Sequence, residues 1–142
     1  MPVTDPDDEL APALRTAVMR LRRRLVTETP SELSVSAMAV LGLLNRAGDL
    51  TVGELAAYER VQPPSMTRTV SCLEQAGHVV RRQGETDRRQ VIVSITDSGR
   101  ERVLADRARR DEWLARRLAE LSPEDQAVLM AAAPILEGLA TD

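Results

Sequence analysis

Two adjacent arginines, Arg88 and Arg89, stand in a polar turn between two β-branched stretches of the chain. An arginine guanidinium is planar and permanently charged, and on a thin loop it suits a narrow groove of negative potential such as the minor groove of DNA. Asp87 precedes the pair and can hold one guanidinium in its working rotamer through a bidentate ion pair, which lowers the entropy lost on binding. These three residues indicate contact with a polyanion; the alternative interpretation is a solvated turn.

A second polar set lies upstream, on a predicted helix over residues 63–76. Met66, Val70 and Leu73 occur at i, i+4 and i+7 and form its buried face. The opposite face is small and polar, so it can enter the DNA major groove without steric conflict. The predicted contacts on this face are Pro64, Ser65, Thr67, Arg68 and Ser71. Arg68 can reach a guanine edge or a phosphate; the alternatives are a salt bridge for Arg68 and local capping for its small neighbours.

The composition argues against an enzyme. All 19 basic residues are Arg, which excludes a lysine-containing phosphate loop and a Schiff-base lysine. One His and one Cys supply neither an ordinary four-ligand zinc site within one chain nor an internal disulfide. Carboxylates are plentiful, but none falls into a recognisable catalytic pair. We therefore expect no catalytic residue, no metal and no cofactor.

Hydrophobic spacing predicts the elements that position the polar residues. Apolar side chains three and four residues apart indicate a first helix over 10–30, ended by the Thr29–Pro30 pair. A capping box of Thr51 and Glu54 opens a short helix, and Pro63 and Pro64 suit the first turn of the next. Further helices are predicted at about 34–46, 97–119 and 123–140, and strands at 79–83 and 90–95.

Helix, short helix, helix and hairpin in this order are typical of a winged helix-turn-helix. In that fold, residues 63–76 are the recognition helix and the Arg88–Arg89 turn is the tip of the wing. We expect a mainly α protein with a small β-hairpin wing, in one domain over 10–142. The winged helix-turn-helix covers 33–96, between long helices at 10–30 and 97–140. Residues 1–9, with four acids and two prolines, are expected to form a disordered acidic tail.

The net charge of −3 conceals two opposite regions. As an average over the chain, it argues against a nucleic-acid binder. Residues 1–9 hold four acids and residues 120–142 hold five, with no Arg in either, so residues 10–119 carry +6. Residues 60–89 hold six Arg against three acids. The basic excess therefore lies where the predicted helix and wing would meet DNA, and Arg60 and Arg81 are further candidates for phosphate contacts.

Together these motifs resemble the MarR family of transcriptional regulators. The resemblance spans about Leu10 to Leu139, and its most specific part is the Asp-Arg-Arg wing followed by a strand that ends in Ile-Thr. The matching segments are 50–56 for the short helix, 62–68 and 73–77 for the recognition helix, and 87–89 for the wing, followed by Val91, Val93, Ile95 and Thr96.

The resemblance implies a homodimer in which the helices at 10–30 and 97–140 interlock at the two-fold axis. It implies binding to a pseudo-palindromic operator in double-stranded DNA, usually as a repressor that a small ligand or an oxidised cysteine releases. Arg89 would enter the minor groove, oriented by Asp87. A two-fold dimer should place its recognition helices about 34 Å apart, one turn of DNA.

An effector pocket is a further implication of the resemblance. Trp113 lies near where ligands of the family enter, and Trp113 and Arg24 are the pocket candidates. Because the chain has two aromatic residues and no Phe, we expect a small phenolic or lipophilic effector rather than a stacking drug. The alternatives are a packing role for Trp113 and, for the arginines at 20 and 22–24, a charged face that pairs with Asp106, Asp111 or Glu112.

Cys72 precedes the core residue Leu73, and we interpret it as a small packing residue rather than a redox sensor. No apolar run is long enough to span a membrane, and the acidic start does not resemble a signal peptide, so we expect a cytoplasmic protein. The alternative to specific DNA binding is a winged-helix module that dimerises or docks another protein.

Overall fold

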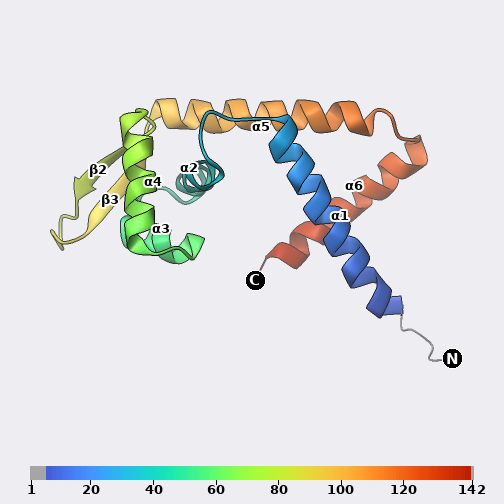
Figure 1. The fold of residues 1–142 in the computed structure, drawn as a ribbon, viewed down its shortest axis with the longest axis horizontal. Coiled ribbons are helices and arrows are strands. Elements are labelled where there is room, and N and C mark those ends of the chain that lie inside the picture. Colours follow the sequence, from blue (N-terminus) through green and yellow to red (C-terminus); the bar gives the residue numbers. More distant parts are fainter. Residues whose placement is uncertain (1–5, 142) are drawn as a thin grey trace. The chain divides into compact units, whose positions relative to one another are not determined.

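The computed structural model describes residues 6–141, with side chains from residue 8 onward (Figure 1). Contacts divide the chain into two compact units. The central unit consists of residues 31–108, and the terminal unit combines the chain up to residue 30 with the chain from residue 109. The central unit contains the expected winged helix-turn-helix and extends beyond residue 96 into the next helix.

Three helices of the central unit form where the sequence predicted them. They are α2 (Val35–Ala47), α3 (Val52–Glu59) and α4 (Pro63–Gln75). The capping box is confirmed, because Thr51 Oγ1 accepts from the Glu54 backbone N–H at 3.0 Å and Glu54 Oε1 accepts from the Thr51 N–H at 3.2 Å.

The core of the central unit is a single apolar cluster between these helices, the sheet and the start of α5. Met66, Val70 and Leu73 are buried, as their spacing predicted. Val35 is 55% exposed, because it is the first residue of α2 and extends past the packed turns. The buried members are Ala37, Val40, Leu41, Leu43, Leu44, Leu55, Ala56, Met66, Val70, Leu73, Val79, Val93 and Val103.

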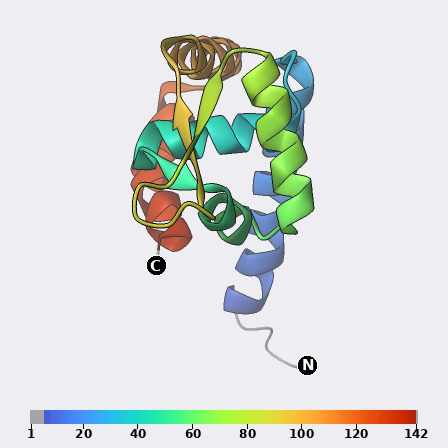
Figure 2. The same cartoon turned by 90° about the vertical axis from the view of Figure 1, so that its left-hand side faces the viewer.

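The hairpin is confirmed and belongs to a three-stranded antiparallel sheet. Strand β2 (Val79–Gln83) pairs with β3 (Val91–Ile95), with Val79 opposite Ile95 and Gln83 opposite Val91. Strand β1 (Leu50–Thr51) adds to the other edge of β3. Two residues are too few for a periodic signal, so the sequence did not predict β1. Figure 2 shows the hairpin beside α4 on one face of the central unit.

Gly77 ends α4 and brings the next elements close to it. Its φ of +81° is a left-handed conformation that suits glycine, and its N–H donates to the Glu74 carbonyl at 3.0 Å. The Thr96 hydroxyl donates to the Gly77 carbonyl at 2.7 Å, just before α5 (Asp97–Leu118) begins. A Cβ at Gly99 would lie 2.3 Å from the His78 carbonyl oxygen, so only glycine permits this crossing of α5 over the hairpin base.

The terminal unit contains α1 (Pro6–Glu28), the C-terminal part of α5 and α6 (Pro123–Ala140). Helix α1 ends before Thr29 as predicted, but it begins at Pro6, so residues 6–9 are helical rather than part of a disordered tail. A proline at the first position and acids in the first turn both favour a helix start. None of the helices within 6–141 is long and apolar enough to cross a membrane.

Candidate nucleic-acid interface

Helix α4 presents a polar stripe to solvent. Pro64, Thr67 and Arg68 are exposed, while Ser65 and Ser71 are half-buried at its margins. Arg68 Nη2 donates to Ser65 Oγ at 3.3 Å, and Thr67 Oγ1 donates to the Pro63 carbonyl at 3.0 Å. The alternative of a salt bridge for Arg68 is not realised among the described residues. Its guanidinium therefore keeps most of its donors directed at solvent.

Cys72 also lies on the exposed side of α4, so the interpretation as a packing residue is wrong. It follows Arg68 by four residues, and residues at i and i+4 share one face of a helix. Its neighbour Leu73 is fully buried, which misled the interpretation. The 3.6-residue period placing Thr67 and Arg68 outward was sufficient to place Cys72 outward as well.

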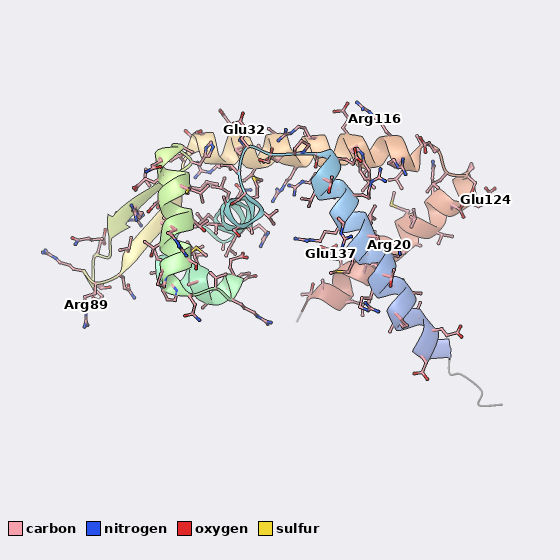
Figure 3. All side chains as sticks on the ribbon, viewed as in Figure 1. Arg20, Glu32, Arg89, Arg116, Glu124 and Glu137 are labelled. Carbon is pink, nitrogen blue, oxygen red and sulfur yellow. The ribbon has the colours of Figure 1, made fainter. Side chains whose placement is uncertain are left out.

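The wing tip holds Arg89 through Asp87. Asp87 Oδ1 accepts from the Arg89 backbone N–H at 3.0 Å and from Arg89 Nε at 3.4 Å. The predicted bidentate pair is thus corrected: one carboxylate oxygen accepts both bonds, because residues two apart in a turn bring a side chain to a backbone N–H. The Arg89 side chain is 94% exposed and projects from the tip of the hairpin (Figure 3).

Gly84 fixes the shape of the wing tip, and sequence reasoning did not single it out. Its N–H donates to the Gln90 carbonyl at 2.9 Å, and the Gln90 N–H donates to the Asp87 carbonyl at 3.1 Å. A Cβ at Gly84 would lie 2.5 Å from the Asp87 carbonyl oxygen. Only glycine fits this turn, which in turn positions Asp87. The available signal was an isolated glycine that opens a polar turn.

Two arginines of the hairpin are bound within the fold. Arg81 Nη2 and Nε donate to the two carboxylate oxygens of Glu74 at 2.9 and 3.4 Å, which ties α4 to β2. The hydrogen bond from Arg81 lowers the pKa of the Glu74 carboxyl below its ordinary value. Arg82 bridges Asp49 at 3.1 Å and the Ser94 hydroxyl at 2.6 Å. These contacts brace the wing and leave Arg81 less suited to a phosphate contact.

Arg60 occupies the turn between α3 and α4 with an unusual backbone. Its φ of +55° and ψ of +44° are left-handed, and it is the one non-glycine residue with positive φ in the described part of the chain. This conformation costs about 1–2 kcal/mol for a residue with a Cβ. The Arg60 N–H donates to the Ala57 carbonyl at 3.3 Å and closes the last turn of α3.

The arginines of residues 60–89 therefore fall into two groups. Arg81 and Arg82 form ion pairs that brace the fold, with Glu74 and Asp49. Arg60, Arg68 and Arg88 have no acidic partner among residues 6–141, and Arg89 is held outward by Asp87. In Figures 1 and 2 the α3–α4 turn, the start of α4 and the hairpin tip all lie toward the lower side of the central unit.

The comparisons with known proteins identify the family of this chain. The MarR family model matches residues 33–91, which cover the helix-turn-helix and most of the wing. An HTH-type transcriptional regulator of Mycobacterium tuberculosis is 45% identical over 136 residues, which cover 95% of each chain. The chain belongs to the MarR family. It is a transcriptional regulator of that family, with a winged-helix fold.

Solved structures agree with this membership of the MarR family along nearly the whole chain. A transcriptional regulator protein from Pseudomonas aeruginosa has a TM-score of 0.86 at 37% identity and covers 98% of this chain and 99% of its own. A MarR family protein from Bacillus stearothermophilus has a TM-score of 0.75 at 26% identity and covers 94% of both chains. The likeness includes the long helices on either side of the winged helix-turn-helix.

In this MarR-family chain, Trp113 lines a small hollow of the terminal unit. The hollow has a volume of about 190 Å³ and is lined by α1 and α5. Arg24 does not line it; Arg24 pairs instead with Glu28, which does, at 3.2 Å. Trp113 also stacks beneath Arg117, whose guanidinium carbon lies 5.8 Å from the ring centroid. The lining residues are Glu28, Thr29, Pro30, Arg109, Glu112, Trp113 and Arg116.

The expected partners of the basic run at 20–24 differ from those in the structure. Arg24 pairs within its own helix, because Glu28 lies four residues away on the same face. Glu112 pairs with Arg116 on α5, and the Asp106 carboxylate accepts from the Ser31 hydroxyl at 3.2 Å. Within residues 6–141, no cluster of three or more His, Cys, Asp or Glu could hold a metal ion.

Proposed function

We propose that this regulator binds a specific sequence in double-stranded DNA, with α4 in the major groove and the wing in the minor groove. The observation that carries the proposal is that α4 and the wing lie beside each other in the central unit (Figure 2), with Arg68 on α4 and Arg89 at the wing tip both exposed to solvent. The small side chains of the α4 stripe, Pro64, Ser65, Thr67 and Ser71, let the helix approach base edges. Arg88 adds charge beside the groove.

We propose further that the protein acts as a homodimer on a pseudo-palindromic operator. Helix α6 has no buried residue, although it is rich in apolar side chains. An apolar surface of this kind in a soluble chain usually marks an interface, and a second copy supplies a matching face by two-fold symmetry. The exposed apolar side chains of the terminal unit include Leu10, Val18, Met19, Leu21, Val128, Leu129, Met130, Ile135, Leu136 and Leu139.

A dimer bound in this way would repress transcription when its operator overlaps a promoter. This role places the protein in the cytoplasm, where it has access to the chromosome. A small phenolic or lipophilic effector at Trp113 is part of the proposal. The hollow of about 190 Å³ is smaller than most drug-sized pockets. Its carboxylates and guanidiniums favour a compact ligand with a polar group over a large planar one.

Selection from a pool of random duplexes tests the proposal directly. The full chain should enrich one inverted repeat, and Arg89→Ala should bind the selected duplex about tenfold or more weakly at matched salt. Arg107→Ala is the matched control, because Arg107 is exposed on α5. If no sequence is enriched, the chain is a winged-helix interaction module rather than a specific DNA binder. If Arg89→Ala binds the selected duplex as well as wild type, the proposed role of the wing is wrong.

A further inference from the structure

The turn between α3 and α4 carries a residue that the fold does not favour. Position 60 needs the left-handed conformation that closes α3, with φ +55° and ψ +44°, and glycine adopts it without strain. Arg occupies it instead. Strained positions of this kind cluster at functional sites, where the side chain contributes something the backbone does not need.

The Arg60 side chain stabilises nothing that the structure describes. Arg60 is exposed, and neither a hydrogen bond nor an ion pair of its guanidinium occurs within residues 6–141. Arg81, the other candidate for a phosphate contact, forms two side-chain hydrogen bonds to Glu74. Arg81 therefore stabilises the fold, whereas Arg60 is available to bind a partner.

The location of the turn indicates which partner that is. Gln62 is the N-cap of α4, two residues after Arg60, so the guanidinium projects from the chain just ahead of the helix proposed to enter the groove. A duplex seated on α4 would bring its sugar-phosphate backbone past the ends of that helix. A guanidinium at that point meets phosphate oxygens rather than base edges.

We infer that Arg60 is a phosphate anchor, a DNA-binding residue that adds affinity without sequence preference. The inference rests on the proposed function and assigns a separate role within it. Arg68 and Arg89 would read or enter the grooves, whereas Arg60 fixes the register of the α4 N-terminus on the backbone. On this inference, the backbone strain at position 60 is retained because the position needs a cation.

The test compares Arg60→Gly, Arg60→Lys and the control Arg107→Gln in the full-length protein. Two fluorescent duplexes serve as probes: one selected by wild type from a random pool, and one of shuffled sequence. Binding is measured by anisotropy from about 50 to 200 mM salt, and the melting temperature is recorded for each variant.

We expect Arg60→Gly to weaken binding to both duplexes by the same factor, roughly threefold to tenfold. The slope of log affinity against log salt should fall by about 0.9 per protomer. Arg60→Lys and Arg107→Gln should keep the wild-type slope. The melting temperature of Arg60→Gly should not fall, because glycine relieves the left-handed strain.

Three results would overturn the inference. They are an unchanged slope and affinity for Arg60→Gly, an equal loss for Arg60→Lys, or a lower melting temperature for Arg60→Gly, which would give Arg60 a structural role. Failure of the proposed function looks different, because wild type would then bind the selected and shuffled duplexes equally. The Arg60 comparison is still decided on the shuffled duplex.

Discussion

The central and terminal units treat their apolar residues in opposite ways. In the central unit, leucines of α2, α3 and α4 are fully buried, with Leu41, Leu55 and Leu73 at 0% exposure. In the terminal unit, α6 has no buried residue and Leu139 is 72% exposed. The central unit therefore completes its core within one chain, whereas the terminal unit leaves a face that a second chain is proposed to cover.

The ion pairs of the arginines also differ between the two units. On the wing, Arg81 and Arg82 reach acids of other elements, Glu74 and Asp49, so they hold the tertiary structure together. On α1 and α5 of the terminal unit, Arg24 and Arg116 pair with acids four residues away on their own helices. Each such pair contributes about 0.3–0.5 kcal/mol to stability. Because both partners lie on one helix, the pair does not hold two elements together.

A charge placed on the exposed apolar surface of each unit should affect the two units very differently. Ile135→Glu on α6 would bury an unpaired carboxylate in the proposed dimer interface, at a cost of about 3–5 kcal/mol. We expect the protein to become monomeric in sedimentation experiments and to lose most of its affinity for the selected duplex.

Val35→Glu is the control for that substitution, since Val35 on α2 is 55% exposed in the central unit, outside the helices expected at the two-fold axis, and Ile135 is 66% exposed. It should leave the oligomeric state unchanged. A dimer that survives Ile135→Glu at micromolar concentration would show that α6 does not form the interface.

Matched core truncations sharpen the contrast in burial. Leu55→Ala removes a fully buried side chain and should lower the free energy of unfolding by about 2–5 kcal/mol. Leu139→Ala should cost about 1 kcal/mol or less in the monomeric background of Ile135→Glu, because Leu139 contacts little within its own chain. Denaturant titration measures both. Equal losses at the two positions would contradict the distinction between a completed and an open core.

Gly84→Ala tests whether DNA binding depends on the shape of the turn at the wing tip. The added Cβ would meet the Asp87 carbonyl oxygen at 2.5 Å, so the turn must open and release Arg89. We expect a loss of DNA affinity of about 1–3 kcal/mol with little change in stability. Gly42→Ala is the control, because its Cβ would lie 3.9 Å from the nearest heavy atom, at Arg46. Wild-type affinity for Gly84→Ala would mean that the tip contributes nothing to binding.

The smallest effect concerns the ion pair that braces the wing. Arg81 depresses the pKa of Glu74, so the pair stabilises the folded state above the unfolded pKa of the carboxyl and is lost as pH falls through the folded pKa. Glu74→Gln should therefore lower stability slightly at neutral pH, where the ion pair is formed, and match wild type at acidic pH, so that the acid end of the stability profile becomes flatter. Thermal melts from neutral to acidic pH provide the measurement. An unchanged acid slope in the variant would show that the pair adds no stability.

Much of the central unit was predictable because its signals are local. The capping box at Thr51 and Glu54, the prolines that open α4 and the glycine that ends it each act within a few residues. The buried face of α4 followed from helical period alone. Strand β1 was not predictable, since it exists only because β3 offers a free edge to Leu50 and Thr51.

The site residues divide along the same line. Residue type and spacing were enough to predict that α4 has a polar face and that an Asp-Arg-Arg turn lies at the wing tip. Which arginines are free depends on the tertiary fold. The acids that bind Arg81 and Arg82 lie 7 and 33 residues away, and spacing carries no information about contacts that packing creates.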